Sequence, residues 1–160
     1  VQTCALPILL DRPALARRKG ADLYVSLHYN AFSGAGSETA KGVETYCLTP
    51  AGAASTNDTE GNGLLVRMPA NRMDYENMAF AWQIQRAVVG QTDLDDRGVK
   101  RARYLELTQM GMPAVLVEGG FMTHPDDAST IWSAESRTKL AEAITDGILH
   151  YKRLVERERP

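Results

Sequence analysis

The chain has 160 residues, 44% of them apolar and 24% charged, and its formal net charge is −2. A chain of this length folds as one domain and buries roughly 70% of its unfolded surface. The near-neutral charge excludes the basic patch by which nucleic-acid-binding domains are recognised. No run approaches the ~20 apolar residues of a membrane span. These values favour an ordinary globular domain that has no membrane span and does not bind nucleic acid.

The first eight residues resemble a sequence of non-biological origin. Residues 1–8 read like the translation of a common sequencing-library adapter, so we expect a non-biological leader, with the natural frame continuing upstream of Leu9. Cys4 would then be an artefact, and a signal peptide could not be seen. Cys47 lies in an apolar-polar run and reads as a small hydrophobe in a strand. The two cysteines lack CxxC spacing, which gives no support to a zinc ribbon or redox motif.

The first half of the chain predicts two strands and a short helix. A stretch rich in Ala, Leu and Arg predicts a helix over 10–18, with Gly20 as its stop. Alternating apolar residues predict strands over 22–28 and 43–48, joined through a Gly/Ser loop. Residues 49–76 show no regular pattern, and a loop of that length is usually functional or disordered.

The second half continues the alternation of helices and strands. We predict a helix over 77–89 with Asn77 and Gly90 as its caps. The remaining predicted elements, in order, are a turn at 95–98, a short strand at 104–107, a buried central parallel strand at 114–118, a helix at 134–152 and a charged tail at 153–160. The alternation predicts the α/β class: a single domain with a mostly parallel sheet and helices on both faces.

Two predicted strands end in residues that can do chemistry. The strand over 22–28 ends in His28, and the apolar strand over 114–118 ends in Glu118, followed by Gly119 and Gly120. Ligands and catalytic groups gather beyond the carboxyl ends of strands in open α/β sheets. Together the two residues suggest a hydrolytic site that depends on a metal.

Each of these residues has a structural alternative. Imidazole is the commonest ligand of first-row metals, although a single histidine is more often structural. An apolar setting favours the neutral form of Glu118 and raises its pKa toward the range of general acid–base catalysis. The alternative is a glutamate that pairs with Arg97 or Arg103 at the sheet edge. His124 is interpreted as the cap of the following helix and His150 as a residue of a polar last helical turn, so neither is a candidate.

Several stretches resemble one enzyme family in their order and spacing. They are Ala21–Ala31 with an SxHxNA ending, Gly42–Tyr46, Asp96–Lys100, Met112–Phe121 and Leu140–Ile148. In these stretches the chain resembles the zinc-dependent N-acetylmuramoyl-L-alanine amidases of the amidase type 3 family. The resemblance covers most of the chain from Leu9 to Tyr151.

The resemblance implies a cell-wall hydrolase. His28 would be a zinc ligand and Glu118 the catalytic acid–base. The reaction would cleave the amide between N-acetylmuramic acid and the L-alanine of the peptidoglycan stem peptide. Peptidoglycan would be the partner and the cell envelope (periplasmic or secreted) the location, with a regulatory protein left open.

The chain also departs from the family. Members carry a further histidine in a Gly-His-Gly turn and a glutamate on the next helix, both before the region matched here, and nothing upstream of His28 is a histidine or a glutamate. The chain thus supplies one of three zinc ligands. We therefore expect residues 9–152 to be the C-terminal portion of an amidase domain that lacks its first strand and helix and is inactive by itself.

Two other functions stay open at this stage. One is a non-catalytic, amidase-like module that binds peptidoglycan or a partner protein. The other is a different zinc amidohydrolase or carboxypeptidase with a layered α/β fold, because a fold does not fix a function.

Overall fold

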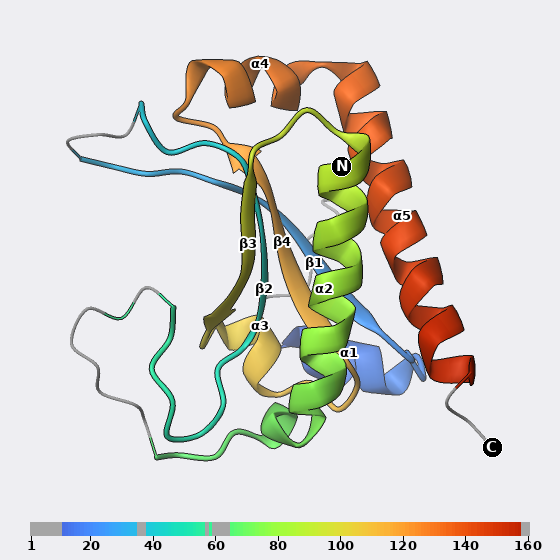
Figure 1. Ribbon diagram of the computed structural model, residues 1–160. Helices are drawn as coiled ribbons and strands as arrows, with labels where there is room; N and C mark the ends of the chain where they lie inside the picture. Colours follow the sequence, from blue (N-terminus) through green and yellow to red (C-terminus); the bar gives the residue numbers. More distant parts are fainter. Residues whose placement is uncertain (1–10, 35–37, 57, 59–64, 158–160) are drawn as a thin grey trace, which may run out of the picture.

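The computed structural model describes residues 11–34, 38–56, 58 and 65–157 of the chain (Figure 1). The predicted leader, residues 1–8, lies outside the described residues. The elements in chain order are α1 (Arg12–Arg18), β1 (Tyr24–Asn30), β2 (Val43–Leu48), the 3-10 helix η2 (Pro69–Met73), α2 (Asp74–Gln91), β3 (Asp96–Ala102), α3 (Leu105–Thr108), β4 (Ala114–Phe121), α4 (Pro125–Trp132) and α5 (Ala134–Arg157).

The four described strands form one mixed sheet in the order β1-β4-β2-β3. β1 runs parallel to β4 and β2 runs parallel to β3, whereas β2 and β4 are antiparallel. The predicted α/β class is confirmed, and two of the three pairings are parallel. β4 is central and buried along its whole length, as its unbroken apolar sequence predicts.

Helices cover both faces of the sheet, each over its own core. On one face, α2 and α5 lie side by side (Figure 1). There Phe80, Ile84 and Ile144 form one buried core with Val115 and Val117. Gly147 of α5 allows the close contact between the two helices, because a Cβ there would lie 2.7 Å from the Cα of Ile84. None of the described helices is long and apolar enough to cross a membrane.

The opposite face is covered by shorter helices. The buried residues Tyr46, Leu107, Met110 and Leu116 form its core, with Ala16 of α1 packed at the edge. These short elements cover only one end of the face. The other end, beyond the carboxyl ends of β1 and β4, holds the polar residues described below.

Four local predictions were wrong. Residues 96–102 form strand β3 rather than a turn at 95–98, and Leu105–Thr108 form one helical turn rather than a strand. Gly90 does not cap α2, because the helix continues through it to Gln91. Asn77 does not cap α2 either, because the helix begins at Asp74. Instead its buried amide donates to Ala70 O and accepts from Ala114 N.

The ends of two elements also differ from the prediction. β4 continues past Glu118 to Phe121, so the glycine pair lies within the strand, where the ring of Tyr29 and the side chain of Leu140 pack closely against Gly119. α5 extends to Arg157, and most of the predicted charged tail is therefore helical.

Candidate functional site

Three acidic or basic side chains form a row across the sheet. His28 of β1 is paired in register with Glu118 of β4, and Glu118 is paired in register with Glu44 of β2. Residues in register on neighbouring strands project from the same face. The row lies at the edge where β1 and β4 end and β2 and β3 begin, on the face that carries α3.

Glu118 is buried without a hydrogen-bond partner for one carboxylate oxygen. Its residue is 8% exposed, and its Oε2 has no partner among the described residues. Desolvation, followed by the nearby charges of Glu44 and Glu106, raises the pKa of Glu118 to about 7. Such a carboxyl group can exchange a proton near neutral pH, which is what general acid–base catalysis requires.

The alternative arrangement, Glu118 paired with an arginine, is not what the structure shows. Arg97 binds Glu44, while Arg103 binds Ser55 and backbone oxygens of the loop after β2. Neither arginine therefore pairs with Glu118 among the described residues.

Glu44 is the fixed negative charge of the site. It is 2% exposed and accepts hydrogen bonds from Arg97 Nε at 2.5 Å, Tyr46 OH at 2.6 Å and Lys100 Nζ at 2.7 Å. Burial alone would raise the pKa of Glu44, but the hydrogen bonds from Lys100, Tyr46 and Arg97 together lower it. Glu44 therefore stays ionised and disfavours a second negative charge on Glu118.

His28 lies on the other side of Glu118. Its Nε2 is 3.0 Å from Ser26 Oγ and 3.4 Å from Glu106 Oε1, and its side chain is 36% exposed. Glu106 comes from the single turn of α3, which the sequence predicted as a strand. The imidazole therefore has a carboxylate neighbour and remains accessible from outside.

These residues do not by themselves form a metal centre. In the described part of the chain, no cluster of three or more His, Cys, Asp or Glu side chains is arranged to hold a metal ion. His28 and Glu106 approach each other, but a catalytic zinc site uses three protein ligands and one open position. The described residues thus do not fit a complete zinc site.

Asp127 of α4 fixes the backbone around the row. Its Oδ2 accepts from Gly42 N and Phe121 N, both at 2.8 Å, and thereby joins the start of β2 to the end of β4. His124 caps α4 by accepting from Asp126 N, as its position before the helix predicts. Both residues therefore hold the loops at this edge of the sheet.

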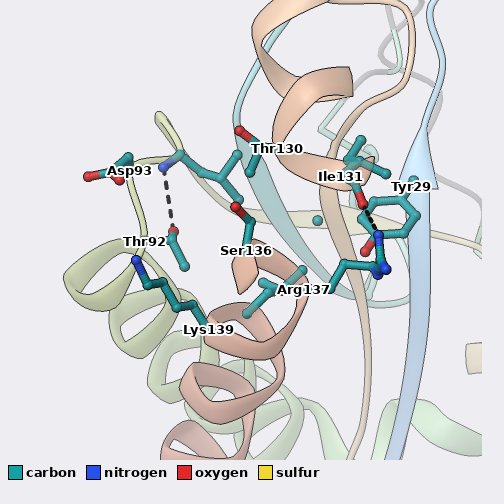
Figure 2. Close-up of a pocket in the computed structure, with 11 residues that line it drawn as sticks. Tyr29, Thr92, Asp93, Thr130, Ile131, Ser136, Arg137 and Lys139 are labelled. Atoms are coloured by element: carbon teal, nitrogen blue, oxygen red, sulfur yellow. Dashed lines mark hydrogen bonds between the residues drawn. The ribbon is translucent and has the colours of Figure 1, made fainter. Parts of the chain in front are cut away.

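Two cavities among the described residues lie on the other face of β1 and β4. One of about 220 Å³ lies between β1 and α5, lined mainly by apolar residues such as Leu27 and Leu140. A smaller one, about 70 Å³, lies between α4 and the start of α5, where Arg137 donates to Ile131 O (Figure 2). Glu118 lines neither of them, because it projects from the opposite, α3-bearing face of the sheet.

Sequence reasoning missed Glu44 and Glu106, and it named Arg97 only as a possible partner of Glu118, whereas Arg97 binds Glu44. A glutamate within the apolar strand 43–48 was a signal for Glu44, because a buried carboxylate requires partners. Nothing local indicated that those partners would come from β3, which was predicted as a turn.

The pKa of Glu118 predicts how stability varies with pH. Because the pKa rises from 4.5 to about 7 on folding, the folded chain holds a proton that the unfolded chain releases between these values. The free energy of unfolding should fall as pH rises through this window. Glu118→Gln avoids that loss, so it should stabilise the chain by about 2–3 kcal/mol at pH 8 and hardly at all at pH 4. Urea unfolding at both pH values measures this, and an equal effect at both would contradict it.

An α/β domain with a protonatable buried carboxyl beside an imidazole at one sheet edge has the layout of a hydrolase. The family model described as N-acetylmuramoyl-L-alanine amidase matches residues 6–150. The chain belongs to the N-acetylmuramoyl-L-alanine amidase family.

Individual relatives agree with the family assignment. The chain is 33% identical over 145 residues to the N-acetylmuramoyl-L-alanine amidase LytC of Bacillus subtilis (strain 168), covering 91% of this chain and 24% of LytC. It is 25% identical over 165 residues to AmiA of Escherichia coli (strain K12), covering 89% of this chain and 56% of AmiA. The chain thus spans less than two thirds of the length of these relatives.

A solved structure has the same fold. The crystal structure of the N-acetylmuramoyl-L-alanine amidase from Clostridium difficile 630 superimposes with a TM-score of 0.70 at 30% identity, over 91% of this chain and 65% of that one. The mixed sheet and its flanking helices are therefore those of an amidase catalytic domain.

Proposed function

We propose that the complete protein hydrolyses the amide bond between N-acetylmuramic acid and L-alanine in peptidoglycan. The observation that carries this proposal is Glu118, which is in register with His28. It is a buried carboxyl with a pKa of about 7, and its Oε2 has no partner within the part of the chain that the structure describes. The membership of the chain in the amidase family supports the choice of substrate. The enzyme would act outside the cytoplasm, in the cell envelope.

Glu118 would move the proton in this reaction. With a pKa of about 7, a substantial fraction of the group is ionised at neutral pH and can accept a proton from the attacking water. The same carboxyl can then donate that proton to the leaving amine of L-alanine. Glu44, held ionised by its cationic partners, favours the return of the proton to Glu118.

His28 would be one ligand of a zinc ion, and the remaining ligands would come from upstream of this chain. The accessible imidazole beside Glu106 supports the role of His28. β1 pairs with β4 alone among the described strands, and Leu27 on it is 65% exposed, which supports a covering segment from the missing first strand and helix. Residues 9–152 would then be the C-terminal portion of the catalytic domain, inactive by itself.

Digestion of purified peptidoglycan tests this function. The complete gene product, supplied with zinc, should release stem peptides that begin with a free L-alanine amine and generate no new reducing sugar ends. A chelator should stop the release, and the 160-residue chain alone should release nothing. Release by the short chain would contradict its inactivity, and no release by the complete protein would contradict the function.

A binding module without catalysis is the second candidate. The lack of a three-ligand cluster among the described residues favours it. The binding-module hypothesis predicts that the complete protein sediments with insoluble peptidoglycan but releases no peptide at any zinc concentration.

A further inference from the structure

Arg97 is an arginine held rigidly beside the acid–base candidate. Its Nε donates to Glu44 Oε1 at 2.5 Å, and its guanidinium carbon lies 5.0 Å from the centroid of the Phe121 ring. These two contacts fix one edge and one face of the planar guanidinium group. Its terminal nitrogens have no hydrogen-bond partner among the described residues, and the side chain is 33% exposed.

The charge of Arg97 is not cancelled by Glu44. Lys100 Nζ binds the same carboxylate oxygen at 2.7 Å, so two cations share one buried anion. Asn30 Nδ2 lies 3.4 Å from the other oxygen of Glu44 and adds a further polar group at the end of β1. Within this cluster, two cations therefore share the charge of one buried carboxylate, and Arg97 is the more exposed of the two.

Arg97 is also close to the row of chemical groups. Its partner Glu44 is in register with Glu118 on the neighbouring strand. Phe121, whose ring lies under the guanidinium group of Arg97, follows Glu118 by three residues on β4. Neighbouring strands are separated by about 4.8 Å. A substrate that places its amide at Glu118 and continues toward β2 and β3 would reach Arg97 within its next few atoms.

We propose that Arg97 binds a carboxylate of the stem peptide, namely the free α-carboxylate of the residue that follows L-alanine. This inference rests on the proposed function and assigns the direction of the peptide to the β2–β3 side of the site. Guanidinium groups bind carboxylates through two parallel hydrogen bonds, which a fixed plane with free terminal nitrogens is suited to make. An amide at the same place would leave the charge of Arg97 unpaired.

A matched pair of substrates tests this subsite. N-acetylmuramoyl-L-alanyl-D-glutamate has the free α-carboxylate, and N-acetylmuramoyl-L-alanyl-D-isoglutamine has an amide in its place. The zinc-loaded complete protein should cleave the first with a kcat/KM about tenfold or more higher, in line with a charge-assisted pair. Arg97→Gln should lower kcat/KM for the acid about 10- to 100-fold and change kcat/KM for the amide less than about threefold. The variant should therefore no longer prefer the acid over the amide.

Two further variants separate binding from a structural effect. Arg97→Lys keeps the charge but loses the two-pronged geometry, so it should retain part of the preference. Arg86→Gln removes an equivalent charge from α2, on the face of the sheet opposite the site. It should leave kcat/KM for both substrates unchanged. An equal loss on both substrates in Arg97→Gln would show that Arg97 acts only through Glu44, and would overturn the subsite.

Binding measurements keep this test independent of catalysis. The Kd values of both compounds are measured by calorimetry with the complete Glu118→Gln protein. A Kd about tenfold lower for the acid is expected, and equal Kd values would overturn the subsite. If wild-type protein cleaves neither compound nor peptidoglycan, the proposed function fails, while the two Kd values still decide the role of Arg97.

Discussion

Replacing Glu118 with glutamine is expected to lower the rate of amide hydrolysis by the complete protein about 10²- to 10⁴-fold, the usual contribution of general acid–base catalysis. Glutamine has nearly the same shape but cannot accept or donate the proton at neutral pH. Glu118 is 8% exposed and its Oε2 has no hydrogen-bond partner among the described residues, so the exchange breaks no hydrogen bond there. Initial rates of peptide release from purified peptidoglycan measure the effect.

The control for this variant is Glu135→Gln. Glu135 lies in the first turn of α5 and pairs with Lys139 at the surface. This exchange removes the same charge away from the site and should leave the rate unchanged. If Glu118→Gln kept more than a tenth of the wild-type rate while its circular dichroism spectrum was native, Glu118 would not be the acid–base group.

Glu44→Gln is expected to destabilise the chain by about 2–4 kcal/mol, because it leaves Arg97 and Lys100 without their shared anion. Breaking a buried ion pair by removing one partner is costly, and the partial exposure of the two cations moderates the cost here. The loss should be clear in urea unfolding at pH 7. Removing the charge of Glu44 should also lower the pKa of Glu118, since that charge helps to raise it.

The matched variant for this prediction is again Glu135→Gln, whose ion pair with Lys139 is mostly exposed to solvent. It should unfold at the same urea concentration as the wild type. A Glu44→Gln protein as stable as the wild type would show that the two cations find other partners or water at no cost. The ion pairs of Glu44 with Arg97 and Lys100 would then add nothing to the free energy of unfolding.

The parts of the fold predicted well are those with strong local signals. The unbroken apolar run of β4 required burial on both faces, and β2 was predicted with its observed ends. Asp96-Arg97-Gly98 resembled a turn because of its glycine, yet the segment pairs with β2 through an irregularity in register. Residues 104–107 alternate like a strand, but only four residues of helix form there.

The candidate site was predicted only in part, because some of its residues have a local sequence signal and others become neighbours only through strand pairing. His28 and Glu118 each stand at or near the end of an apolar run, where a polar residue is conspicuous. Glu44 and Arg97 are separated by 53 positions, and only the pairing of β2 with β3 makes them neighbours. The antiparallel pairing of β2 with β4 was not predicted either, and it is what places Glu44 beside Glu118. The roles of His28 and Glu118 stay predictions.

The register of β1 with β4 has a consequence for how the chain folds. His28 and Glu118 are partners although roughly 90 positions separate them, and every pairing in this sheet joins distant segments. Closing such long loops costs chain entropy before any contact is gained, so folding should be slow for a domain of this size. During synthesis, β2 can pair with β3, but β1 has no partner among the described strands until β4 has left the ribosome. A nascent chain therefore carries no assembled acid–base site until most of the domain has been made.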